Sequence, residues 1–232
     1  MTNREQPQVP GDVSPVFEDY LTAVFKSEEW DDTATTSDLS ALLGVTASTV
    51  SATLKKLSRE GHIDYEPYGR FSLTDSGRAI AVGVLRRRRI IETYLAEALG
   101  LSPDEVHGEA DLLEHAVSAR VLERMSAAVG NPSFDPHGDP IPGPDGQMPS
   151  PDEETSVPLT QLPDGEDATV TRVRDSDPAV VRYLTGRGIT VSAELRMITT
   201  APSIGTVTVE VDGTKRDLPE PVAAAVRVRP QH

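Results

Sequence analysis

The spacing of apolar residues changes from a helical period to strict alternation along this chain of 232 residues. Up to about residue 129 they recur every three or four positions, which is typical of helices that bury one face. From Val157 onward they alternate with polar residues over short runs, at 168–173, 206–211 and 226–229, which is typical of strands. A turn is expected at Asp212-Gly213, and a short helix at 178–186 interrupts the strands. Residues 130–155 are rich in Pro, Gly and Asp and show neither pattern. We therefore expect helices, then a loop and linker, then a β-rich tail.

The first predicted helix begins with the pair Ser14-Pro15, an N-cap followed by a proline at the first helical position. Two shorter helices follow, the earlier one capped by Thr36 or Ser37 and ended by Gly44. The three helices are expected at 14–30, 38–43 and 46–61. Two short helices joined by a tight turn form the helix-turn-helix pattern, although an αα-hairpin inside a helical bundle gives the same pattern.

The second short helix carries small hydroxyl, alanine and basic side chains around its apolar positions. Small side chains permit close approach to base edges, whereas Lys and Arg reach phosphates. Residues 62–73 then alternate around a turn, which predicts a two-stranded wing with Arg70 at its tip. The DNA-binding candidates are Thr46, Ser48, Thr49, Ser51, Ala52, Thr53, Lys55, Lys56, Arg59 and Arg70.

The charge distribution supports that interpretation only locally. The formal net charge of −15 argues against nucleic acid for the chain as a whole. Between Ser37 and Arg89, however, the sequence contains nine basic and five acidic residues. One positive segment in an acidic protein is typical of a nucleic-acid contact surface. The chain has no cysteine and shows no secretion signal or apolar run long enough for a membrane span, so we expect a cytoplasmic protein without thiolate chemistry.

The next helix, expected at 76–99, contains four consecutive arginines, 86–89. Arg88 and Glu92 stand four positions apart on it, a spacing that favours an ion pair within the helix. Gly100 ends this helix, and Ser102-Pro103-Asp104-Glu105 gives the next one a capped start.

A further helix is expected over Val106–Met125, and it carries the most distinctive side chains of the chain. Two imidazoles and two carboxylates share one stripe of it, His107, Asp111, Glu114 and His115. Without a cation the carboxylates repel one another. Oxygen ligands mixed with imidazole suit a divalent first-row metal, and hard carboxylates favour manganese or ferrous iron. The alternative is a solvated acidic helix face.

The order of these elements resembles the diphtheria-toxin-repressor family of metal-activated repressors. The resemblance extends from about residue 14 to the end, and its most specific part is the motif V-H-x-E-A-x-x-x-E-H at 106–115, followed by D-P-H-G-D-P-I-P at 135–142. The iron-sensing branch typically carries Cys where this chain has Asp111, and Met where it has Asp19. Both changes replace soft sulfur with a hard carboxylate, so the chain looks like the manganese-sensing branch.

The resemblance implies a principal metal site formed by Asp19, Asp111, Glu114 and His115. It implies an ancillary site that uses Glu92, His107 and a tail-domain carboxylate, for which Asp177 is the candidate. The family's other ancillary ligand, a histidine, is replaced by Arg88. Because a guanidinium does not bind metal and carries a fixed positive charge, we expect a weakened or lost ancillary site, with Arg88 paired to Glu92.

The resemblance also implies a fold and a mechanism. We expect a mainly α chain with a β tail: a winged helix-turn-helix at 14–77, a helical dimerisation and metal-binding domain at 78–150, and an SH3-like, FeoA-like small β-barrel at 157–232. Metal binding would fix the spacing of the paired recognition helices, and the homodimer would then bind a double-stranded, palindromic operator. The chain would thus be a manganese-activated repressor of metal-homeostasis genes, with no enzyme activity.

Three alternatives remain at this point. The first is an iron(II)-dependent repressor of the same family. The second is a winged-helix regulator of an organic ligand, which should show an aromatic-rich pocket, whereas aromatic content is only 4%. The third is a carboxylate-bridged di-metal enzyme, which needs two E-x-x-H motifs that this chain lacks. We therefore expect Mn²⁺ as the cofactor, with Fe²⁺ second, and neither a membrane nor a small organic substrate as a partner.

Overall fold

The computed structural model describes residues 13–30, 34–65, 71–149, 156–201 and 205–231. The chain forms two compact units, residues 1–86 and 87–232. Helix α4 (Asp75–Leu99) contributes to both of them. Within the described ranges, no helix has the length and apolar character needed to cross a membrane.

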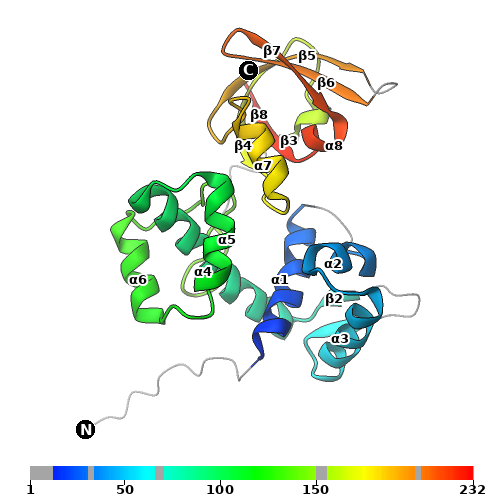
Figure 1. The fold of residues 1–232 in the computed structure, drawn as a ribbon, viewed down its shortest axis with the longest axis vertical. Coiled ribbons are helices and arrows are strands. Elements are labelled where there is room, and N and C mark those ends of the chain that lie inside the picture. Colours follow the sequence, from blue (N-terminus) through cyan, green and yellow to red (C-terminus); the bar gives the residue numbers. More distant parts are fainter. Residues whose placement is uncertain (1–12, 31–33, 66–70, 150–155, 202–204, 232) are drawn as a thin grey trace. The chain divides into compact units, whose positions relative to one another are not determined.

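The first unit has the predicted winged helix-turn-helix elements (Figure 1, blue to cyan). They are α1 (Pro15–Glu29), α2 (Thr36–Leu43), α3 (Ala47–Arg59), β1 (Ile63–Tyr65) and β2 (Phe71–Leu73). The strands pair antiparallel, with Ile63 opposite Leu73. The predicted wing turn, including Arg70, lies outside the described residues.

The N-terminal cap of α2 differs from the prediction of Thr36 or Ser37. The Thr35 hydroxyl accepts a hydrogen bond from the Asp38 amide (3.2 Å), and the Asp38 carboxylate accepts one from the Thr35 amide (3.0 Å). This reciprocal arrangement satisfies two amides at once, which a cap one residue later could not do. Gly44 ends α2 in the left-handed region (φ 64°), as its position in the sequence predicts.

The single helix predicted over residues 106–125 is wrong, because the structure has two. Helix α5 (Pro103–Leu113) ends before Glu114, and α6 (Ala119–Ala128) begins after a short turn. In that turn the amides of residues 116 and 117 both donate to the Leu113 carbonyl, each over 2.9 Å. The Ser118 hydroxyl then accepts from the Val121 amide and caps α6. Ser118 therefore offers the backbone a helix start where the apolar period alone indicates continuation.

The segment after α6 is more buried than the surface loop and linker that its composition predicts. Residues 131–149 form neither helix nor paired strand, apart from an isolated bridge between Phe134 and Pro140. Ile141 packs into the apolar core of the helices. Asp135 and Asp139 are less than 7% exposed. The loop thus contributes charged groups to the interior of this unit.

The β-rich tail is a six-stranded antiparallel sheet with strand order β3-β8-β4-β5-β6-β7. The strands are β3 (Val157–Pro158), β4 (Asp167–Val173), β5 (Glu194–Ala201), β6 (Thr206–Val211), β7 (Thr214–Pro219) and β8 (Val226–Pro230). The pattern predicts β4, β6, β8 and the turn at Asp212-Gly213. It misses the two-residue strand β3 as well as β5 and β7, and in β7 only Leu218 is buried. The predicted fold class, mainly α with an SH3-like β tail, is confirmed.

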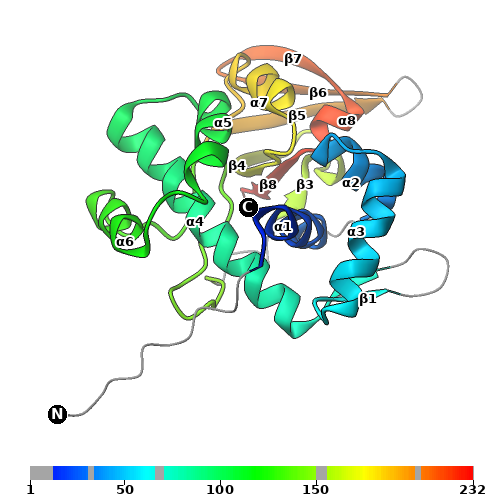
Figure 2. The ribbon, with the colours of Figure 1, turned by 60° about the horizontal axis from the view of Figure 1, so that its bottom comes forward.

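Three short helices accompany the sheet: the 3-10 helix η3 (Leu159–Gln161), α7 (Pro178–Thr185) and α8 (Glu220–Ala223). Helix α7 matches the helix predicted between the strands. It lies beside α5 (Figure 2), where the Arg182 guanidinium donates to the Asp104 carboxylate over 2.8 Å. This contact joins the β tail to the helices of the same unit.

Alanine substitution at two glycines of α4 should change the free energy of unfolding in opposite directions. A Cβ at Gly77 would stand 2.0 Å from the His62 carbonyl oxygen, which is backbone, whereas a Cβ at Gly83 would meet nothing within 4 Å. We expect Gly77→Ala to lower the free energy of unfolding by about 1–3 kcal/mol through overpacking. Gly83→Ala should raise it by roughly 1 kcal/mol through helix propensity. Urea unfolding followed by circular dichroism measures both, and an unchanged midpoint for Gly77→Ala would contradict the close approach.

Candidate metal centre and nucleic-acid interface

Helix α3 presents its predicted DNA-contacting side chains around a buried apolar stripe. The stripe consists of Val50, Leu54 and Leu57. Of the predicted contact residues, Thr46, Ser48, Thr49, Ala52, Lys55, Lys56 and Arg59 are exposed, and Ser51 and Thr53 are half-buried. This distribution leaves one polar and basic face of the helix open to a ligand.

Local hydrogen bonds already use some of these groups. The Thr46 hydroxyl caps α3 by accepting from the Thr49 amide (3.2 Å), and it lies 2.8 Å from the Ser48 hydroxyl. Lys56 lies over the Phe17 ring at 4.6 Å, and Arg59 donates to the Lys55 carbonyl. Lys55 itself is exposed and is the clearest candidate for a phosphate contact.

The arginine run of α4 is directed inward at its end. Arg89 is 1% exposed and donates to the Pro140 carbonyl over 2.7 Å. Its guanidinium also lies 3.4 Å from Asp139 and 3.9 Å from Asp135. Arg88 is 14% exposed at its side chain. Part of the positive segment seen in the sequence therefore neutralises buried carboxylates rather than extending the DNA-binding face.

Arg88 binds carboxylates other than the one its spacing predicts. Its Nε and Nη2 atoms donate to the two oxygens of Glu114 over 2.8 and 3.0 Å. The same Nη2 lies 2.6 Å from Asp111 Oδ1. The direct partners of Arg88 are thus Glu114 and Asp111, two predicted ligands of the principal site, rather than Glu92. A bidentate guanidinium–carboxylate pair is among the stronger ion pairs in proteins.

The environment of Arg88 favours the protonated, charged form of its guanidinium. Burial lowers the pKa of the guanidinium, but its hydrogen bonds to Glu114 and the charges of Glu114, Asp111 and Glu92 raise the pKa above its ordinary value. Arginine is protonated under all physiological conditions in any case. A permanent cation therefore faces these carboxylates.

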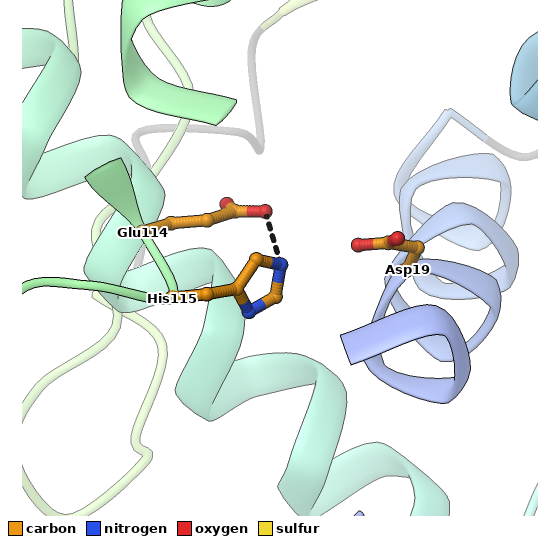
Figure 3. A group of neighbouring side chains, drawn as sticks. All are labelled: Asp19, Glu114 and His115. Atoms are coloured by element: carbon orange, nitrogen blue, oxygen red, sulfur yellow. Dashed lines mark ion pairs between the residues drawn. The ribbon is translucent and has the colours of Figure 1, made fainter. Parts of the chain in front are cut away.

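Glu114 and His115 lie next to each other at the end of α5. His115 Nε2 is 3.2 Å from Glu114 Oε1 (Figure 3), and Glu114 is 2% exposed. Asp19, the remaining ligand predicted for the principal site, lies on α1 in the first unit (Figure 3). Glu114 supplies carboxylate oxygens and His115 an imidazole, so the donor types suit a divalent first-row metal.

A second group of possible metal ligands lies deeper in the same unit. One ligand atom each of Glu92, His107 and Asp175 lie within 4.8 Å of one another, and so do atoms of Glu92, Asp135 and His137. Glu92 belongs to both groups and is fully buried. Neither of its carboxylate oxygens has a hydrogen-bond partner, and the same holds for the Nδ1 atoms of His107 and His137. Orphaned buried polar atoms are costly, so this arrangement fits an absent ligand.

The tautomer of His137 supports a metal-binding role. Its Nε2 is 3.1 Å from the Pro103 carbonyl oxygen, which can only accept, so Nε2 carries the proton. The lone pair of the neutral ring is then on Nδ1, the buried atom without a partner. Metal-binding histidines commonly donate their other ring N–H to a backbone carbonyl in this way.

Buried charges of both signs surround this cluster. Among the described residues, the carboxylates of Glu92, Asp135, Asp139 and Asp175 are buried, and so are Arg89 and Arg172. Arg172 Nε contacts Asp139 directly. A divalent cation would supply positive charge beside the Glu92 carboxylate, whose two oxygens have no hydrogen-bond partner.

Protons are the other way to supply positive charge. Burial, followed by the charge of Asp139, raises the pKa of Asp135 to about 8. Burial lowers the pKa of His137, but the charges of Asp135, Asp175, Glu92 and Asp139 raise it above its ordinary value. Without a metal the cluster therefore holds protons near neutral pH, and a metal would release them.

Models of three known protein domains match successive parts of this chain. The model of the N-terminal DNA-binding domain of iron dependent repressors matches residues 12–70, and the model of their metal binding and dimerisation domain matches residues 74–143. A FeoA domain model matches residues 157–230. Iron-dependent repressor IdeR of Mycobacterium tuberculosis is 32% identical over 219 residues, which cover 90% of this chain and 94% of IdeR.

The chain belongs to the iron-dependent repressor family, the family of the diphtheria toxin repressor. It is a metal-dependent, DNA-binding transcriptional repressor rather than an enzyme. The solved structure of a manganese-dependent transcriptional repressor in complex with manganese is 41% identical with a TM-score of 0.84, covering 93% of this chain and all of that one. The manganese regulator SloR is 28% identical with a TM-score of 0.81, covering 94% of this chain and all of SloR.

In the structure, Asp175 rather than the predicted Asp177 lies near the other predicted ancillary ligands of this repressor. Asp177 caps α7 by accepting from the Ala179 amide over 2.8 Å. Asp175, two residues earlier, lies 4.0 Å from His107 Nδ1 and groups with Glu92. Sequence reasoning also missed Asp135 and His137, which the composition of their loop assigned to the surface. The signal available was the tight D-P-H-G-D-P run, since two charged residues and a histidine around one Gly turn are unusual for a plain linker.

Replacing Glu92 tests whether the cluster holds unbalanced charge in the metal-free repressor. Its carboxylate is buried without a hydrogen-bond partner, so we expect Glu92→Gln to raise the unfolding midpoint in excess chelator, corresponding to about 1–3 kcal/mol. Glu97→Gln, an exposed position on the same helix, is the control and should change little. A clear loss of stability in Glu92→Gln would show that this carboxylate is satisfied in the metal-free protein.

Proposed function

We propose that this repressor is activated by manganese and controls genes of metal-ion homeostasis. The observation that supports this most is the donor set: Asp19 and Asp111 are carboxylates where the iron-sensing branch is typically expected to carry sulfur. Hard oxygen donors favour Mn²⁺ relative to sites that contain thiolate or thioether. Solved relatives described as manganese-dependent, at up to 41% identity, add to this support, whereas IdeR is described as iron-dependent.

The proposed principal site consists of Asp19, Asp111, Glu114 and His115. Glu114 and His115 follow α5, and Asp19 is on α1 of the DNA-binding unit. A metal bound to ligands from both units would restrict their relative orientation, and it would favour DNA binding only through its differential affinity for the two arrangements. Apo repressor would then bind operator weakly because the recognition helices are not held at the required spacing.

The proposed second metal position is the buried cluster that contains Glu92, His107 and Asp175, with Asp135 and His137 on its other side. The oxygens of Glu92, which lack a hydrogen-bond partner, and the tautomer of His137 support it. Arg88 contacts Glu114 and Asp111 instead of the predicted Glu92, so its guanidinium leaves the Glu92 carboxylate available. We therefore propose that the ancillary position is retained in this chain with a ligand set that lacks the family's first histidine.

The proposed DNA-binding form is a homodimer on a palindromic operator. The dimerisation domain model matches residues 74–143, which include several exposed apolar side chains. Leu112 is 73% exposed on α5, Leu99 is 58% exposed at the end of α4, and Val121 is 47% exposed on α6. Large apolar side chains exposed on a dimerisation domain suit a subunit interface. Two copies of α3 would then meet half-sites about one helical turn apart.

The decisive experiment is a titration of operator binding with metals. Affinity for the promoter region of the repressor's own gene is measured in parallel with Mn²⁺, Fe²⁺, Zn²⁺ and a chelator. We expect Mn²⁺ to raise the affinity by tenfold or more, and Fe²⁺ to raise it less. A larger effect of Fe²⁺ would favour an iron sensor, and tight binding that chelator does not weaken would refute metal activation.

Lys55 tests the orientation of α3 on DNA. Because a phosphate contact carries no sequence information, Lys55→Ala should weaken specific and nonspecific DNA alike and reduce the slope of log K against log salt by roughly one. Lys215→Ala, an exposed lysine of β7, is the matched control and should leave both unchanged. Loss confined to one operator position would instead assign Lys55 to base contact.

A further inference from the structure

We propose that Arg88 is an internal competitor of the activating metal: its guanidinium occupies the carboxylates of Glu114 and Asp111, and metal binding requires its release. This inference rests on the proposed principal site, since both carboxylates are proposed ligands there. It adds to that site a regulatory contact, the one that Arg88 makes with Glu114 and Asp111.

The geometry makes simultaneous occupancy unfavourable. Two donors of Arg88 hold both oxygens of Glu114, at 2.8 and 3.0 Å, and one of them also lies 2.6 Å from Asp111. Both oxygens of Glu114 and one of Asp111 thus already face a positive charge. A divalent ion bound at the same oxygens would stand close to a second cation in a largely buried position, where charge repulsion is weakly screened.

The pair is also built to persist when no metal is present. Glu114 is 2% exposed, so its carboxylate would be buried without a counter-charge if Arg88 left. A planar fork matches a carboxylate better than a lysine ammonium does. The metal-free site is therefore closed by the protein's own cation instead of being held open by carboxylate repulsion.

The consequence is a shifted threshold for activation. When a site is competent only for the fraction of time in which an internal group has left, the apparent Kd is the intrinsic Kd divided by that fraction. Because the same two ion pairs must break for every metal, the shift applies to Mn²⁺ and Fe²⁺ alike. Arg88 therefore sets the metal concentration at which the repressor responds and leaves the order among metals to the ligands.

The test measures metal binding directly, without DNA. Free Mn²⁺ is followed by electron paramagnetic resonance at equilibrium with full-length protein, comparing wild type, Arg88→Gln and Arg88→Lys. Each protein also carries Glu92→Gln, which confines the measurement to the site of Glu114. Gln has no charge and cannot make the bidentate pair. We expect Arg88→Gln to bind Mn²⁺ about 10- to 100-fold tighter, the range typical of groups adjacent to metal ligands.

Two further measurements separate competition from a structural effect. Arg88→Lys should fall between wild type and Arg88→Gln, because a point charge holds Glu114 less firmly. Arg120→Gln removes the same charge from an exposed position of α6 and should not change the affinity. In chelator, Arg88→Gln should unfold at a lower temperature than wild type, and saturating Mn²⁺ should raise its midpoint by more than that of wild type.

The outcomes distinguish this inference from the proposed function. Equal or weaker Mn²⁺ binding by Arg88→Gln, with wild type binding normally, would overturn the competitor role and leave the metal site intact. If neither protein binds Mn²⁺ at this site, the proposed principal site itself fails. Should Arg88→Gln not fold, Arg88→Lys decides: tighter binding than wild type supports competition, and equal or weaker binding refutes it.

Discussion

Compensation of buried negative charge is the constraint on which the metal-binding half of this repressor depends. Among the described residues around α4 and the 131–149 loop, buried carboxylates outnumber buried arginines. Burying an unpaired carboxylate costs several kcal/mol, so each must find a cation, a proton or a metal. Arg89 and Arg172 form ion pairs with Asp139, while the carboxylate oxygens of Glu92 have no hydrogen-bond partner. The placement of the positive charges thus decides where a metal can contribute to stability.

The same element, α4, supplies both kinds of charge. Arg88 and Arg89 are neighbours in sequence, yet one pairs with Glu114 after α5 and the other with the 131–149 loop. The side chains of successive helix residues point about 100° apart, so these two adjacent arginines reach different carboxylates. Two arginines of a run of four that looks solvated or DNA-facing in the sequence therefore pair with different buried carboxylates.

Local signals predicted the fold well where caps and periodicity agree. Ser14, Thr46 and Gly44 mark helix ends as expected. The signals failed where a helix start overrides an unbroken apolar period, at Ser118, and where a strand such as β7 carries little apolar alternation. The β-rich tail was nevertheless predicted from its other strands, and the family resemblance implied its SH3-like fold. Residue periodicity indicates which face is buried, but it cannot show that a helix stops for five residues.

The site was predictable only to the level of ligand type. The motif at 106–115 indicated carboxylates and imidazoles for a metal, which the break after Leu113 does not change. The partner of Arg88 was not predictable from spacing, because its position four residues before Glu92 favours a helical pair. In the bidentate contact, Arg88 donates to both oxygens of Glu114 and also lies against Asp111, a long-range arrangement that the i,i+4 spacing does not indicate. Long-range pairing of charges, rather than local sequence, therefore separates the two proposed metal positions.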